Sequence, residues 1–155
     1  MTVFFYLFTL FLSLFLQIFL RNLLSNFAPN FLLLLVVYIA LAQGVIAGIF
    51  FGFTLGLLSD IFSLNPFGSQ AFLFTLVGYL AGRQNGKIDA DQPLAQVILV
   101  FLTSFVYLFG LYLFTSFFSV PEKKFNLFPQ ILMNIFFTVP FFWFFRYWFK
   151  LWRQK

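Results

Sequence analysis

Residues 44–60 read GVIAGIFFGFTLGLLSD, and a glycine recurs in this segment at every fourth position. Each four-residue step advances about 40° around an α-helix, so the glycines form one slowly winding stripe. The stripe consists of Gly44, Gly48, Gly52 and Gly56, with Ala40 and Asp60 in phase before and after it. A face without side chains lets a second backbone approach closely, which is how helices gain packing energy in lipid. The stripe predicts a close helix contact, either inside this chain or with a partner.

This stretch belongs to a chain that is almost free of charge. Of its 155 residues, 63% are hydrophobic and 8% are charged. The charge-free runs cover residues 1–20, 22–59, 61–82, 92–121 and 125–145. A soluble domain carries about 25% charged residues, whereas roughly 20 apolar residues are enough for a helix to cross the hydrocarbon core. We expect an all-α integral membrane protein, which excludes a water-soluble globule, a disordered chain and a disulfide-stapled secreted domain.

Polar residues, glycine and proline divide these runs into about six predicted transmembrane helices. Residues 31–59 are too many for one upright helix and few for two, so we place a break at Ala42-Gln43-Gly44. The short helix before this break would be tilted, half-inserted or thinning the bilayer. Asn65-Pro66 is a helix-stop signal in the next turn. We expect residues 1–155 to form a single membrane domain with spans at 3–20, 31–41, 44–59, 67–82, 94–118 and 127–145.

The first span is expected to remain in the mature protein. Met1-Thr2-Val3 contains no basic residue, and the segment from Arg21 to Asn26 that follows the span lacks a small-residue cleavage site. Both features argue against a signal peptide.

The basic residues predict an orientation. Six crossings place both termini on one side, and if that side is the cytoplasm, six basic residues lie inside and three outside. Lysine and arginine are retained on the cytoplasmic side, so this orientation is favoured. The inside set is Arg83, Lys87, Arg146, Lys150, Arg153 and Lys155, and the outside set is Arg21, Lys123 and Lys124.

Residues 146–155 are then a basic aromatic cytoplasmic tail. Aromatic and basic side chains together favour the headgroup layer, so this end is expected to be an interfacial anchor, with a partner-binding helix as the alternative. The anchor residues are Trp143, Arg146, Trp148, Lys150, Trp152 and Arg153.

The span at 67–82 offers a surface that matches the glycine stripe. Its small residues are Ala71, Thr75, Gly78 and Gly82, with Tyr79 beside them. Only a few residues join this span to the glycine-rich one, so an antiparallel hairpin of two small-residue faces is expected.

Asp60 stands at the carboxyl end of the glycine-rich helix, where the helix dipole disfavours an anion. A carboxylate in an unfavourable place is a mild sign of function. The alternative is that Asp60 marks the water interface and accepts hydrogen bonds from N–H groups in the turn from Ser63 to Phe67. The sequence leaves both interpretations open.

The sequence assembles no catalytic or cofactor site. It contains no histidine and no cysteine, which excludes imidazole and thiol chemistry and the zinc or haem ligation that depends on those side chains. Asp89 and Asp91 lie beside Lys87 in the most polar stretch and are expected to be solvated. The basic residues sit at the ends of apolar runs, which is unlike a stripe that follows nucleic-acid phosphates. We expect no enzyme activity, no cofactor, no metal and no nucleic acid.

Three short motifs resemble one known family. They are Gly56-Leu57-Leu58-Ser59-Asp60, Pro66-Phe67-Gly68 with Ala71-Phe72, and Gly78-Tyr79-Leu80-Ala81-Gly82-Arg83. They are similar to the Gly-Leu-Leu-x-Asp, Pro-x-Gly and Gly-Tyr-Leu-x-Gly-Arg/Lys motifs of the rod shape-determining protein MreD family. The chain length, the six expected spans and the short second helix also resemble that family.

The resemblance implies a non-enzymatic scaffold in the bacterial cytoplasmic (inner) membrane that serves cell elongation and peptidoglycan synthesis. Such proteins associate with MreC, and indirectly with the synthase of RodA and a class B penicillin-binding protein and with MreB. The implied fold is similar to the substrate-binding components of energy-coupling-factor transporters, and a homo-oligomer is left open. The residues expected to shape the hairpin and a groove for the MreC span are Gly56, Asp60, Pro66, Gly68, Gly78, Tyr79 and Gly82.

Two other functions are less compatible with the sequence than a scaffold. The shared fold suggests the substrate-binding component of a vitamin transporter as the alternative. Those components present an Ala-x-x-x-Ala face on the first helix, and residues 3–20 contain no alanine. A small lipid-modifying enzyme is disfavoured because histidine, cysteine and carboxylate pairs are lacking.

Overall fold

The computed structural model describes residues 2–24, 28–63, 66–87, 92–118 and 127–153, with side chains for 9–20, 22–23, 28–63, 66–87, 92–118 and 128–147. All regular secondary structure in these ranges is helical, which confirms the predicted all-α class for this part of the chain. The helices are α1 (Thr2–Leu24), α2 (Phe31–Gln43), α3 (Val45–Ile61), α4 (Ser69–Gly82), α5 (Pro93–Phe117) and α6 (Leu127–Arg153).

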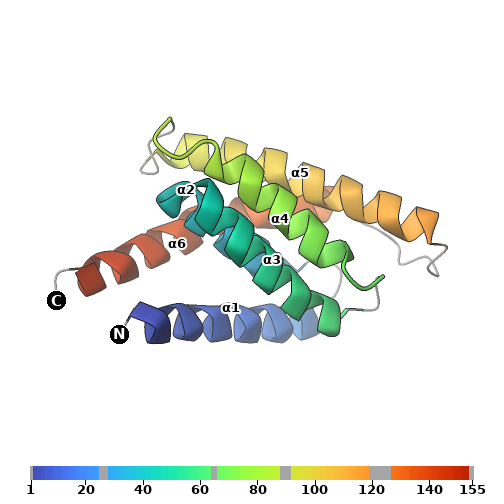
Figure 1. The fold of residues 1–155 in the computed structure, drawn as a ribbon, viewed down its shortest axis with the longest axis horizontal. Coiled ribbons are helices and arrows are strands. Elements are labelled where there is room, and N and C mark those ends of the chain that lie inside the picture. The colour runs from blue at the N-terminus through green and yellow to red at the C-terminus, as the bar shows by residue number, and fades with distance from the viewer. Residues whose placement is uncertain (1, 25–27, 64–65, 88–91, 119–126, 154–155) are drawn as a thin grey trace.

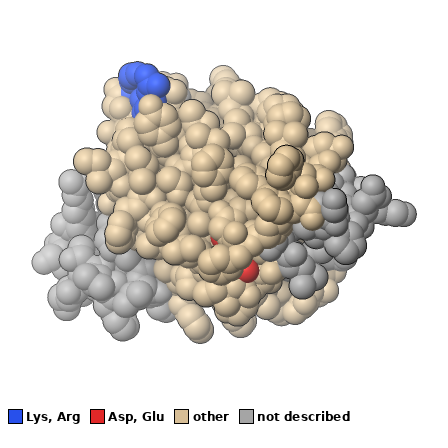
Figure 2. All heavy atoms as spheres, turned by 45° about the vertical axis from the view of Figure 1, so that its right-hand side comes forward, with Lys and Arg blue, Asp and Glu red and all other residues tan. Residues whose placement is uncertain are grey.

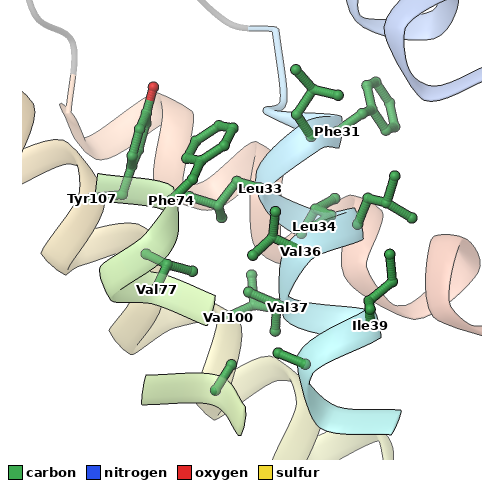
Figure 3. Packing of buried hydrophobic residues seen from close by; sticks show 14 of the residues in the cluster. Phe31, Leu33, Leu34, Val36, Val37, Ile39, Phe74, Val77, Val100 and Tyr107 are labelled. Carbon is green, nitrogen blue, oxygen red and sulfur yellow. The ribbon is translucent and has the colours of Figure 1, made fainter. Parts of the chain in front are cut away.

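The short helix α2 lies at the centre of the fold and contacts each of the other five helices. Ten of its 13 residues are buried, from Phe31 to Leu41 with Tyr38 half-buried. Its sequence is apolar all round, which is typical of a helix buried either in protein or in lipid. Figure 3 shows side chains of α2, such as Leu33, Val36 and Val37, packed among Phe74, Val77 and Val100.

The other helices surround α2 as two hairpins and one separate helix. α3 and α4 form the most intimate pair, and α5 packs against both α4 and α6. Among the described residues α1 contacts only α2. Figure 1 shows both chain termini and the turn after α4 at one end of the molecule.

The helix boundaries follow local signals in the sequence. Gly44, with φ 90°, is the single residue between α2 and α3, within the predicted break at Ala42-Gln43-Gly44. α4 begins at Ser69, later than the expected start at residue 67, because Gly68 takes a left-handed φ of 91° as its N-cap. α6 does not end at residue 145 as expected but runs to Arg153. The sequence after Pro140 contains no proline or glycine to stop it.

Helix length separates α5 and α6 from the rest. Only Pro93–Phe117 and Phe128–Tyr147 are both long and apolar enough to cross a membrane by length and composition, among the described residues. α2, α3 and α4 have 13, 17 and 14 residues, or about 20, 26 and 21 Å at 1.5 Å per residue. A hydrocarbon core is about 30 Å thick. Two candidate spans are therefore present by this measure, and six crossings remain a prediction.

Candidate functional site

The glycine face of α3 packs directly against the backbone of α4. A Cβ atom on Gly48 would overlap the carbonyl group of Gly78, and one on Gly52 would overlap the carbonyl group of Phe74. A Cβ atom on Gly56 would overlap the Cα atom of Ala71. All three glycines are buried. The stripe is therefore filled by α4 of the same chain.

The matching face of α4 is equally close. A Cβ atom on Gly78 would overlap the carbonyl group of Gly48, and one on Gly82 would lie 2.6 Å from the Cα atom of Val45. Real Cβ atoms essentially never approach another heavy atom within 3.0 Å. The two helices consequently touch through their main chains over the whole length of the hairpin, from Val45 and Gly82 to Gly56 and Ala71.

Gly44 has a different role from the other members of the stripe. It lies in the break between α2 and α3, and a Cβ atom added to it would meet only the side chain of Asn85, at an ordinary contact distance of 3.7 Å. The Asn85 side-chain amide donates a hydrogen bond to the Leu41 carbonyl oxygen at 2.6 Å. This bond satisfies one of the carbonyls that a helix leaves free at its carboxyl end. Gly44 thus serves the turn through its positive φ, and its own lack of a Cβ atom is not what lets α4 approach.

Asp60 joins the two helices at the far end of the hairpin. Its Oδ2 atom accepts hydrogen bonds from the backbone N–H groups of Gly68 and Ala71, both at 3.0 Å. Its Oδ1 atom accepts one from the N–H group of Gln70, also at 3.0 Å. The carboxylate is only 3% exposed. Although it ends α3, it lies at the amino end of α4, where the helix dipole favours an anion.

The geometry of Asp60 supports the structural interpretation of the two that the sequence left open. The bonded N–H groups belong to Gly68 and to Gln70 and Ala71 in the first turn of α4, so they lie just beyond the predicted turn from Ser63 to Phe67. Pro66 contributes its carbonyl oxygen, which accepts a hydrogen bond from the Ser69 N–H at 3.1 Å. Gly68 reaches the carboxylate because its positive φ turns the chain sharply into α4.

One hydrogen bond and one ring contact that the sequence did not predict join the hairpin to α5. The side-chain oxygen of Gln70 accepts a hydrogen bond from the Tyr107 hydroxyl at 2.7 Å, and both side chains are buried. The rings of Tyr107 and Phe74 also meet, with centroids 5.3 Å apart. The only sequence signal for Gln70 is that it is a polar residue near the start of the apolar span at 67–82, just after the Pro-x-Gly motif.

A buried polar cluster at the start of α2 was also missed. The Asn134 side chain accepts a hydrogen bond from the Asn30 N–H at 2.8 Å and donates one to the Ser104 hydroxyl at 3.0 Å. Asn30 caps its own helix by accepting from the Leu33 N–H, and Gln17 of α1 accepts from the Leu32 N–H. The bond between Asn134 and Ser104 thus joins α6 to α5. Asn30 before an apolar run is an N-cap signal that sequence reasoning could have used.

Four of the remaining predicted residues are described, and all four are exposed. Tyr79 and Arg83 are exposed, with the guanidinium group 5.9 Å from the ring centroid. Trp143 and Arg146 of the predicted anchor are exposed on α6, and the Trp143 ring stacks on Tyr147. The side chains of Trp148, Lys150, Trp152 and Arg153 lie outside the described residues, as do Asp89 and Asp91.

The described part of the chain holds no group of three or more His, Cys, Asp or Glu residues that could bind a metal ion. Its one described carboxylate, Asp60, already accepts three backbone hydrogen bonds. This arrangement packs the glycine-lined α3–α4 hairpin against the central apolar helix α2. It also leaves large apolar side chains exposed on the outside. These include Ile46, Phe50 and Phe53 on α3 and Phe101 and Phe105 on α5.

These features define a class, an all-helical and almost uncharged membrane protein whose distinctive site is a contact between helix backbones. The model of the rod shape-determining protein MreD family matches residues 1–152. The chain belongs to this family, which confirms the resemblance seen in its motifs. No curated protein and no solved structure is similar enough to count as a match.

Proposed function

We propose that this protein is a non-enzymatic scaffold of the machinery that elongates rod-shaped bacteria and that it acts by helix packing. Membership of the MreD family implies a role in determining rod shape. The observation that supports packing as the mode of action is the α3–α4 hairpin, whose motif residues hold helices together. The absence of histidine and cysteine from the sequence supports a role without catalysis.

The proposed direct partner is MreC, which would link this chain indirectly to the synthase of RodA and a class B penicillin-binding protein and to MreB. The family resemblance implies a small-residue groove for the MreC span, but α4 of the same chain fills that face. The proposed contact is therefore the outward face of α3, where Phe50 and Phe53 are 63% and 50% exposed. The motif residues fix the opposite face of the same helix, so they would hold this surface in place.

The proposed setting is the bacterial cytoplasmic membrane, with six crossings and both termini in the cytoplasm. Both termini lie at one end of the fold in Figure 1 together with the turn that carries Arg83 and Lys87. The short helices α2–α4 would cross by thinning the bilayer locally. A fold similar to the substrate-binding components of energy-coupling-factor transporters remains part of this proposal, supported by six helices with a short second one.

Depletion in the native bacterium, combined with purification in mild detergent, tests the proposal. We expect the depleted cells to become round and the tagged wild-type protein to co-purify with MreC. The alternative, a vitamin-transporter component, predicts cells that stay rod-shaped and a purified protein that carries a bound vitamin and ATPase subunits. That second outcome would overturn the scaffold proposal.

A further inference from the structure

Two exposed basic residues form a patch on the turn that follows α4. They are Arg83 and Lys87, four residues apart in the segment from Arg83 to Lys87. Figure 2 shows lysine and arginine atoms gathered at one edge of a face that is otherwise nearly free of charge. The only acidic group described, Asp60, lies at the opposite end of α4 and is engaged by three N–H groups.

The turn that carries the patch is fixed to the body of the fold. Asn85, between the two basic residues, points inward and bonds the Leu41 carbonyl oxygen at 2.6 Å. Backbone hydrogen bonds from Asn85 to Gly82 and from Lys87 to Gln84 close the turn at 3.1 and 3.0 Å. The Tyr79 ring lies 5.9 Å from the Arg83 guanidinium carbon. A cation held in this way loses less side-chain freedom when it binds a ligand.

A crossing of the bilayer by α4 would favour an anionic partner for the patch. α4 is about 21 Å long at 1.5 Å per residue, shorter than the hydrocarbon core of about 30 Å. Its carboxyl end therefore lies close to the acyl chains unless headgroups come down to it. A cation at such a depth is costly unless it pairs with an anion or reaches the headgroup layer.

We propose that Arg83 and Lys87 bind the headgroup of an anionic phospholipid. The planar guanidinium group can donate two parallel hydrogen bonds to phosphate oxygens, and the lysine adds a point charge. Tyr79 is suited to the same layer, because amphipathic rings prefer the membrane interface. This lipid site rests on the proposed crossing of the membrane by α4, but it goes beyond the proposed scaffold role and does not depend on that role.

Native mass spectrometry of the full chain in detergent tests the site. The protein is given an equimolar mixture of phosphatidylglycerol and phosphatidylcholine, and the ratio of the two bound lipids is measured. The test variant is Arg83→Gln/Lys87→Gln, and the matched control is Arg83→Lys/Lys87→Arg, which keeps both charges. One basic residue near an anionic membrane contributes about a fivefold preference, so we expect the test variant to lose at least about fivefold and the control to stay near wild type.

Three outcomes would overturn the proposal. The first is an unchanged lipid ratio in the test variant. The second is an equal loss in both variants at an unchanged unfolding temperature in detergent, because the control variant keeps both charges on an intact fold. The third is displacement of the lipid by free glycerol phosphate or by a glutamate-rich peptide, which would assign the patch to a soluble phosphate or to a protein.

Discussion

At the scale of single residues, the close contact of α3 and α4 rests on positions that were visible in the sequence. The four-residue repeat indicated that Gly48, Gly52 and Gly56 share a face, and α4 packs on that face. The role of Asp60 could not be decided from sequence. A carboxylate at the end of one helix is unfavourable, and only the fold shows that the next helix begins beside it with three free N–H groups.

Replacing Asp60 should destabilise the hairpin. Asp60→Ala leaves three N–H groups at the start of α4 without their acceptor, and we expect a loss of about 2–3 kcal/mol. Asp60→Asn keeps one acceptor oxygen and should lose less. Thermal unfolding in detergent measures both changes, and wild-type stability of Asp60→Ala would contradict the assigned role.

A pair of glycine variants separates backbone contact from ordinary packing. In Gly52→Ala the new methyl group meets the Phe74 carbonyl of the α4 main chain, whereas in Gly110→Ala it meets the flexible end of the Leu73 side chain. Overpacking costs about 1–3 kcal/mol, and replacing glycine in a helix by alanine gains about 1 kcal/mol. We expect Gly52→Ala to lose about 2 kcal/mol and Gly110→Ala to change little. Equal effects on unfolding temperature would show that the backbone contact is not special.

At the scale of elements, α2 is the helix that the sequence described least completely. Its position and the break at Gly44 followed from composition and a glycine, but its burial by five neighbours did not. An all-apolar segment is compatible with burial in lipid or in protein, and periodicity cannot distinguish the two. The polar side chains that cluster at its amino end come from α1, α5 and α6, which are far apart in sequence.

This polar cluster yields a prediction for α6. Asn134→Ala removes the acceptor of the Asn30 N–H and the donor to Ser104, both buried. A buried group left unpaired costs about 1–3 kcal/mol, so we expect a clear drop in unfolding temperature. Gln130→Ala, one turn earlier on the same helix and half-buried, is the control and should change little. The same drop in both variants would remove the special role of the cluster.

At the scale of the whole molecule, the sequence predicted the class and the family, whereas the number of crossings rests on more than composition. Charge-free runs indicated six spans, yet α2, α3 and α4 are shorter than a hydrocarbon core. Run length measures what is apolar, whereas helix length depends on where glycine and a capping residue interrupt the chain. Residues 146–153 of the predicted tail likewise belong to α6, because aromatic and basic residues are compatible with a continuing helix.

The orientation can be tested without background because the chain contains no cysteine. We expect Lys87→Cys and Lys155→Cys to react with a membrane-impermeant thiol reagent only after the cytoplasmic membrane has been permeabilised. Glu122→Cys should react in intact cells with a permeable outer layer. The reverse pattern, or Lys87 and Glu122 on the same side, would refute six crossings with both termini in the cytoplasm.

The proposed mode of action is the packing of a partner helix on the outward face of α3. Site-directed photo-crosslinking in living cells measures this contact. A photoreactive phenylalanine analogue is placed at Phe53 on α3 or, as a matched control, at Phe105 on α5. These residues are 50% and 53% exposed. We expect a crosslink to MreC from Phe53 and none from Phe105, in cells that remain rod-shaped. Functional protein that crosslinks to MreC from neither position, or only from Phe105, would contradict it.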